Sequence, residues 1–116
     1  MHARLTDLVG KPLIVTQGEI DHSNCKAMDR LFDEAILAGN EVVLVDLSKV
    51  DYIDSGGLSV LFSAARRLRE KGWLGLIAPN TSVMRLLEIV GVVADPSFRV
   101  FPDQASVNRL LGGKTS

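Results

Sequence analysis

A short polar segment, Asp54-Ser55-Gly56-Gly57, brings together the residue types in this chain that are best suited to chemistry. A serine hydroxyl attacks an electrophile when a neighbouring base removes its proton, and it can also accept a phosphoryl group from a kinase. Apolar residues at helical spacing begin at residue 58, so Ser55 is expected at the start of a helix, where free backbone N–H groups tolerate added negative charge. A simpler interpretation is that Asp54 and Ser55 only cap this helix and that the glycines only shape the turn.

Nucleophilic serine chemistry finds little support in the surrounding sequence. His22, Asp46 and Ser55 do follow one another in the order of the chymotrypsin-type triad. That fold needs two β-barrels and about twice this length, whereas here a helical pattern begins directly after the glycines. The Gly-x-Ser-x-Gly motif of the α/β-hydrolases is also absent around Ser55. We therefore predict that the protein is not an enzyme.

The sequence also lacks the residues for aspartate phosphorylation, metal binding or nucleotide binding. In a receiver domain Asp46 would accept the phosphoryl group, but no acidic pair follows the strand expected at residues 13–17 to hold magnesium. His2 and His22 have no metal-ligand spacing, and neither glycine-rich phosphate-binding motif occurs. We predict that the protein uses no metal and no cofactor.

Composition predicts a single cytoplasmic domain over residues 1–116, with a frayed tail at 111–116. The chain has 116 residues, of which 47% are hydrophobic, enough for one core. A net charge of −1 argues against direct nucleic-acid binding, and the basic run at residues 66–69 is expected on the solvated side of a helix. No apolar run approaches the ~18 residues of a membrane span, and no signal-peptide pattern opens the chain. The single cysteine, Cys25, fits a reducing compartment.

Alternating strand and helix patterns predict an α/β domain with a mixed, mostly parallel sheet of four to five strands and about four helices. Strands are expected at residues 4–9, 13–17, 42–47, 73–78 and 98–101, and helices are expected to begin near residues 24, 55, 81 and 103. A tight turn joins the first two strands, which must therefore be antiparallel. The loops after parallel strands gather at one edge of the sheet, so Asp21, Ser55 and Asn80 are expected there together.

The helix that follows Ser55 offers a candidate docking face. Five apolar residues at helical spacing are expected to face the core, namely Leu58, Leu61, Phe62, Ala65 and Leu68. Val60 is expected to point away from that side, among the small residues Ser59, Ser63 and Ala64. Gly56 and Gly57 are expected to leave the backbone bare, so that another protein could approach closely. A single exposed valine is also ordinary, so a plain surface stays an alternative.

The whole arrangement resembles the STAS domain of bacterial anti-sigma factor antagonists. The resemblance covers nearly the entire chain and is most specific over residues 45–58, with support from residues 18–21 and 83–92. It implies that Ser55 is phosphorylated by a partner anti-sigma factor that is itself an ATP-dependent serine kinase. It also implies that only the unphosphorylated protein binds this partner and thereby frees a sigma factor. Asp21 matches an aspartate of the family's interface, whereas Gly56 stands where the family often has a second serine or threonine.

We therefore expect a bacterial, non-enzymatic binding module that regulates transcription through an ATP-bound anti-sigma factor with serine kinase activity. Ser55 is the expected phosphoacceptor. The expected partner-binding residues are Asp21, Asp54, Gly56, Gly57, Ser59, Val60 and Ser63. A phosphate beside Asp54 would add about −1.5 to −2 charges, so we expect a large change in binding with little change in fold. The alternative is a scaffold or regulatory STAS subunit of a stress-signalling or transport complex, without a phosphorylation cycle.

Overall fold

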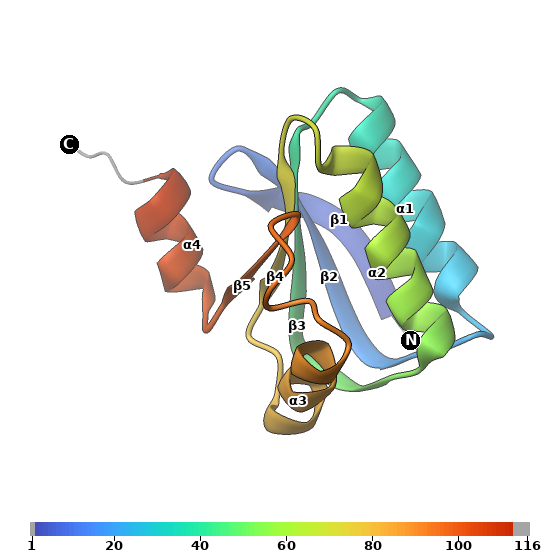
Figure 1. Cartoon of the computed structure of the whole chain (residues 1–116). Helices are drawn as coiled ribbons and strands as arrows, with labels where there is room; N and C mark the ends of the chain where they lie inside the picture. Colours follow the sequence, from blue (N-terminus) through green and yellow to red (C-terminus); the bar gives the residue numbers. More distant parts are fainter. Residues whose placement is uncertain (1, 113–116) are drawn as a thin grey trace.

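A five-stranded sheet in the order β1-β2-β3-β4-β5 forms the centre of the molecule (Figure 1). The computed structural model describes residues 2–112. The strands are β1 His2–Leu8, β2 Lys11–Ile20, β3 Val42–Ile53, β4 Trp73–Ile77 and β5 Phe98–Phe101. β1 pairs antiparallel with β2, and the other neighbours pair in parallel. The predicted mixed, mostly parallel α/β architecture is thus confirmed.

Helices cover both faces of this sheet. They are α1 Cys25–Leu37, α2 Ser55–Leu68, α3 Thr81–Ile89 and α4 Gln104–Leu111. Figure 1 shows α1 and α2 side by side along one face, while α4 stands apart from them beyond β5. Leu111 is the last residue of α4 and Gly112 is its C-cap, so the chain does not fray as early as residue 111. The expectation for residues 113–116 lies outside the described residues.

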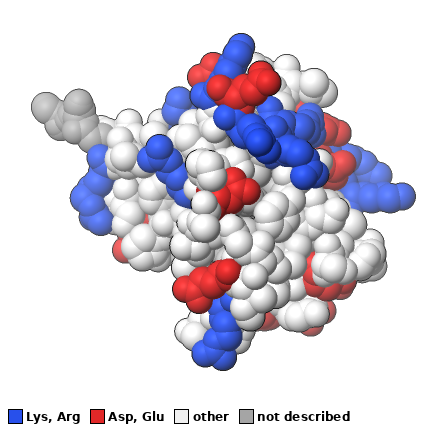
Figure 2. Space-filling model, in the orientation of Figure 1, with Lys and Arg blue, Asp and Glu red and all other residues white. Residues whose placement is uncertain are grey.

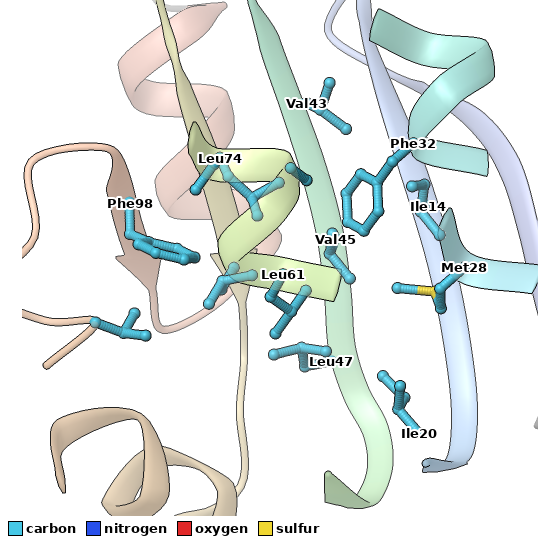
Figure 3. Close-up of a cluster of buried hydrophobic side chains, with 14 of the residues drawn as sticks. Ile14, Ile20, Met28, Phe32, Val43, Val45, Leu47, Leu61, Leu74 and Phe98 are labelled. Carbon is cyan, nitrogen blue, oxygen red and sulfur yellow. The ribbon is translucent and has the colours of Figure 1, made fainter. Parts of the chain in front are cut away.

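The core has two parts because the central strands are covered on both faces. The larger part fills the space between the sheet and helices α1 and α2, where Phe32 and Leu61 point toward Val45 on β3 (Figure 3). The smaller part lies under α4 and contains Leu13, Leu44, Ile77, Phe101 and Val107. Val45 and Leu44 are neighbours on β3 and point to opposite faces, which explains why this strand is apolar at successive positions.

Strands β2 and β3 are longer than the sequence pattern predicts. We expected them to end at residues 17 and 47, but they continue to Ile20 and Ile53. The extension of β3 looks like a turn in the sequence because it is mostly polar. Val50 and Ile53 in this extension are buried, however, each after two exposed residues, and Ile20 pairs with Ile53 across the two strands. The longer strands carry the Asp54–Ser55 segment well beyond the end of β4.

Several other element ends differ from the prediction by one or a few residues. β1 stops at Leu8 because Val9 and Gly10 adopt positive φ angles of 46° and 80°, which suit a two-residue hairpin turn. Strand β4 ends at Ile77, one residue before its predicted end, and Ala78 after it has a positive φ angle of 57°. None of these differences alters the topology.

Candidate functional site

The site lies where β2 and β3 end side by side and the chain turns into α1 and α2. The backbone N–H of Asp54 donates to the carbonyl oxygen of Ile20 at 3.0 Å, the last link between the two strands. Beyond it, residues 21–24 lead into α1, whereas Ser55 begins α2 directly. The expected meeting of the loop after β2 with the Ser55 segment is therefore confirmed.

Asp54, not Ser55, caps helix α2. Its Oδ1 atom accepts a hydrogen bond from the backbone N–H of Gly57 at 3.0 Å, the usual N-cap contact. Ser55 is consequently the first residue inside the helix, and its side chain is exposed. The simpler interpretation, in which Asp54 and Ser55 cap the helix, is therefore confirmed for Asp54 and wrong for Ser55.

The second oxygen of Asp54 links this cap to the loop after β2. Oδ2 accepts from the backbone N–H of His22 at 3.2 Å and lies 3.0 Å from the His22 ring nitrogen Nδ1. The Asp54 side chain is 24% exposed, whereas that of His22 is 73% exposed. His22 therefore forms the outer wall of the site and Asp54 its floor.

Hydrogen bonding keeps Asp54 ionised over a wide pH range. Desolvation in its partly buried position would raise the pKa of this carboxyl group. Hydrogen bonds from the Gly57 backbone N–H, from the His22 ring and from the His22 backbone N–H outweigh that effect and lower the pKa to about 2. A negative charge thus lies next to the Ser55 hydroxyl at neutral pH.

Asp21 shapes the loop, and its two chain neighbours, Ile20 and His22, both bond Asp54. Its Oδ1 atom accepts from the backbone N–H of Ser23 at 2.9 Å and from the Ser23 hydroxyl at 2.6 Å. The side chain of Asn24 fastens the same loop, because its Oδ1 accepts from the Asp21 N–H at 3.0 Å and its Nδ2 donates to the Glu19 carbonyl at 2.9 Å. The loop is therefore held in shape by its own polar side chains.

The two glycines are buried, so the expectation that they leave bare backbone for a partner is wrong. A Cβ atom on Gly57 would lie 2.8 Å from Cγ2 of both Ile20 and Ile53, and one on Gly56 would lie 2.9 Å from the His22 ring. Gly57 is thus needed for the close approach of α2 to the strand ends. Gly56 makes room for His22 to reach Asp54.

The predicted docking face on α2 is only partly available. Ser59 is exposed and Ser63 is half-buried, so both can be reached by a partner protein. Val60 is half-buried and packs against the larger core, and Ala64 is 1% exposed. The prediction that Val60 and Ala64 face solvent fails because α2 packs against α1 as well as the sheet, so a wider stripe is covered.

The loop that contains Asn80, the third one expected at this edge, contacts β3 before the strand reaches Asp54. The Asn80 side chain caps α3 by accepting from the Val83 N–H at 2.8 Å, and its Nδ2 donates to the carbonyl oxygen of Val50 at 3.0 Å. No hydrogen bond to Ser55 or Asp54 is found for Asn80 among residues 2–112. Asn80 thus joins the same edge of the sheet without entering the site.

The residues of the discarded triad do not assemble. The Asp46 carboxylate is 9% exposed and accepts from the Ser48 N–H at 2.8 Å and from Gln104 Nε2 at 2.9 Å. It therefore points toward α4, whereas the His22 ring contacts Asp54. Within residues 2–112, no group of three or more His, Cys, Asp or Glu side chains is placed to hold a metal ion.

Comparison with known proteins identifies the family. The family model described as Mlab, STAS domain, matches residues 6–94 of this chain. The chain belongs to the STAS domain family. This STAS domain is 25% identical over 97 residues to the anti-sigma-F factor antagonist RsfB of Mycobacterium tuberculosis. The matched region covers 84% of this chain and 78% of RsfB. It is 27% identical over 95 residues to the anti-sigma F factor antagonist of Paenibacillus polymyxa, and this match covers 80% of this chain and 77% of that protein.

A solved structure agrees with the fold of this STAS domain. The unphosphorylated form of the antagonist SpoIIAA from Bacillus superposes with a TM-score of 0.80 and 18% sequence identity, over 98% of this chain and 100% of that one. The relatives named above are regulators that antagonise an anti-sigma factor. The prediction of a non-enzymatic protein is confirmed by this relationship.

His22 is the site residue that sequence reasoning missed. The sequence singles it out only in the order of the discarded triad, yet it bonds Asp54 through both its backbone N–H and its ring. A sequence gives little sign of this contact, because 32 positions separate the two residues. The one usable signal was the convergence of the two strand ends, which placed residues 18–24 beside the Ser55 segment.

Charge on the STAS domain is distributed unevenly. In Figure 2 a group of Lys and Arg side chains lies at the top, where α1 and α2 end, with some Asp and Glu among them, whereas Asp and Glu side chains are seen at the lower right, where these helices begin. Arg66 and Arg67 belong to the last turn of α2, about 16 Å along the helix from Ser55. Arg67 donates to Asp33 at 2.6 Å, so part of this basic charge is locally paired.

In the described part of the chain, no helix is long and apolar enough to cross a membrane.

Proposed function

We propose that this protein, as one STAS domain over residues 1–116, is an anti-sigma factor antagonist of the cytoplasm. It binds an ATP-bound anti-sigma factor with serine kinase activity and so regulates sigma-factor-dependent transcription. Phosphorylation of Ser55 switches this binding off. The observation that carries the proposal is the exposed Ser55 hydroxyl at the first position of α2, beside an Asp54–His22 pair that holds the turn in one shape.

The position of Ser55 suits a phosphoacceptor for two reasons. A kinase active site must reach the hydroxyl, and Ser55 is exposed while the residues around it are fixed by hydrogen bonds. The product must also be tolerated by the fold. The N-terminus of a helix favours negative charge, and a phosphate there can accept from backbone N–H groups that the Asp54 cap does not use.

The same chemistry makes the switch effective at an interface. Asp54 is ionised at neutral pH, so a phosphate on Ser55 would add about −1.5 to −2 charges beside an existing negative charge. A partner surface fitted to a neutral hydroxyl would meet added bulk, repulsion and the cost of removing water from the phosphate. A loss of about 2.8 kcal/mol in binding corresponds to a hundredfold weaker affinity.

Because some of the expected partner-binding residues are buried, the proposed contact surface differs from the predicted one. Ser55, Ser59 and the exposed edge of Ser63 form the part contributed by α2, and Asp21 with His22 forms the rim from the loop after β2. Gly56 and Gly57 support this surface from beneath without touching the partner. Val60 contributes through its half-buried side chain.

Phosphorylation in vitro tests the assignment of the acceptor. The purified protein is incubated with its anti-sigma factor kinase and ATP, and phosphopeptides are identified by mass spectrometry. We expect one phosphate on Ser55 and none on the Ser55→Ala variant. Ser59→Ala is the matched control, because Ser59 is also exposed on α2 but lies one turn further along, and it should be phosphorylated as wild type. Undiminished phosphorylation of Ser55→Ala would show that the acceptor is wrong.

A partner experiment separates this proposal from the scaffold alternative. The protein is used to capture its partner from cells of the source organism, in the unphosphorylated form and as Ser55→Asp. Capture of an ATP-binding serine kinase by the first form alone supports the antagonist. Equal capture of a transport or stress-signalling assembly by both forms would instead support a scaffold subunit without a phosphorylation cycle.

A further inference from the structure

Strand β5 leaves one edge of the sheet open, far from the Ser55 site. Among the residues that the structure describes, it pairs with β4 alone, on the opposite side of the sheet from β1 (Figure 1). The carbonyl oxygens of Ser97 and Phe101 accept from β4 and the residue that follows it, at 2.9 and 2.7 Å. Because backbone groups alternate along a strand, the N–H and C=O of Val100 and the C=O of Phe98 point to the open edge. The Phe98 N–H is already bound to the Asp95 carbonyl at 3.0 Å.

A largely apolar groove of about 820 Å³ runs along this edge. One wall is formed by Met84 of α3 and by Val93, which is 53% exposed. The other wall includes Leu110 of α4, which is 49% exposed, and the floor is β5 itself. The groove therefore combines free backbone hydrogen-bonding groups with apolar side chains on both sides of them.

The two faces of β5 differ in charge. Val100 packs on the face that carries the larger core, on the side of Met84 and Val93. Arg99 is exposed on the α4 face, where its guanidinium group lies 4.8 Å from the centre of the Trp73 ring. Among residues 2–112, Arg99 forms no ion pair with a carboxylate. A strand added here would thus place alternate side chains against an apolar wall and beside a cation.

We propose that the open edge of β5 binds an extended peptide segment of another protein by strand addition. The segment alternates apolar and acidic side chains. Its backbone pairs with Val100 and Phe98, its apolar side chains contact Val93 and Met84, and its carboxylates face Arg99. This surface is separate from the Ser55 site, so the interaction does not depend on phosphorylation.

A second copy of the chain fits this edge poorly. Two β5 strands related by a twofold axis would pair so that opposite residues share a face of the sheet. The registers centred on the strand place the two Arg99 side chains either directly opposite one another or on a diagonal about 7–8 Å apart. Either arrangement brings like charges together, whereas an acidic partner strand removes the repulsion.

A peptide titration followed by NMR tests the proposal. The probe is a capped seven-residue peptide in which valine and glutamate alternate, added to the full-length protein. We expect shifts confined to Phe98–Phe101 and the groove walls, and slower hydrogen exchange of the Val100 amide. The matched peptide with lysine in place of glutamate should bind more weakly. A glutamate peptide N-methylated at alternate residues, so that one edge of its backbone cannot pair, should lose binding.

A charge swap on the protein completes the test. Arg99→Glu should weaken binding of the glutamate peptide by roughly fivefold and favour the lysine peptide. Ser55→Asp should bind the glutamate peptide as wild type does, which separates this result from the fate of the proposed switch. The proposal is overturned by unchanged binding of the N-methylated peptide, by equal binding of both charged peptides, by shifts at the Ser55 end, or by self-association through β5.

Discussion

At the scale of single residues, one carboxylate organises the site. Asp54 uses one oxygen to cap α2 and the other to hold His22, so the start of a helix and a distant loop share a single anchor. This arrangement leaves the next residue, Ser55, without a capping role and exposed. The hydroxyl can therefore change chemically without breaking the contacts that fix the turn.

A phosphomimetic substitution follows from this separation of roles. Ser55→Asp adds one negative charge at the first position of α2, where the helix N-terminus favours it. We expect the circular dichroism spectrum and melting temperature to stay close to those of wild type, while affinity for the anti-sigma factor falls at least tenfold. Calorimetric titration measures the affinity. Ser59→Asp places the same charge one turn away and should weaken binding less. A large loss of melting temperature in Ser55→Asp would contradict the separation.

The low pKa of Asp54 predicts a particular dependence of stability on pH. Its pKa falls from 3.8 to about 2 on folding, so ionised Asp54 stabilises the folded state. That contribution is complete above the unfolded pKa and is lost as the pH falls from about 4 to about 2. The difference in unfolding free energy between wild type and Asp54→Asn should therefore be largest near neutral pH and shrink across this range. If this difference in unfolding free energy stayed constant from pH 6 to pH 2, ionised Asp54 would not stabilise the folded state as proposed.

At the scale of elements, the site depends on how closely α2 approaches the ends of β2 and β3. Gly57 lies where the helix, Ile20 and Ile53 meet, and no side chain fits between them. The first turn of α2 therefore contains glycine at a position where helix propensity alone would favour another residue. Tertiary contact outweighs local preference here.

Substitution of the two glycines should separate packing from loop contact. Gly57→Ala places a methyl group 2.8 Å from two isoleucine side chains and 2.9 Å from a backbone oxygen, so we expect a loss of ~1–3 kcal/mol in unfolding free energy. In Gly56→Ala the nearest atoms to the new methyl group belong to the exposed His22 ring, at 2.9 Å, and to the Asp54 carboxylate, at 3.1 Å, so the ring should turn away at little cost. Urea unfolding compares the two variants. Equal stability of both would show that the strand ends yield to the added methyl group.

At the scale of the whole molecule, α4 is connected to the central strand by a partly buried polar contact. Gln104 at the start of α4 donates to the carboxylate of Asp46 on β3 at 2.9 Å, and Val107 packs into the smaller core. Asp46 thus has a structural role, although its position near the middle of the chain resembles that of a phosphoacceptor aspartate. Its contact with α4 explains why a charged residue occurs within the otherwise apolar first half of β3, residues 42–47.

Removal of this contact should loosen α4. Gln104→Ala leaves an oxygen of the 9% exposed Asp46 without its donor, so we expect a loss of ~1–3 kcal/mol in unfolding free energy. Amide exchange in α4 should become faster, while phosphorylation of Ser55 is unchanged. Asn108→Ala is the control, because Asn108 is exposed on the same helix. An equal loss of stability in both variants would contradict the role of the Asp46 contact.

Local sequence was enough for the order of strands and helices, the antiparallel opening pair and the exposed serine at a helix start. These features depend on hydrophobic periodicity, capping residues and connection length, which act between near neighbours. The family motif over residues 45–58 also directed attention to the correct turn. None of these signals needs a contact between distant segments.

Only the tertiary structure decided the features that join residues far apart in the chain. The polar part of β3 is a strand because β2 pairs with it, and Gly57 is buried because two isoleucines from different strands lie against it. The His22–Asp54 contact and the cover of Val60 by neighbouring elements arise in the same way. Each depends on the free energy of packing between separate elements, and a one-dimensional pattern does not record which elements will meet.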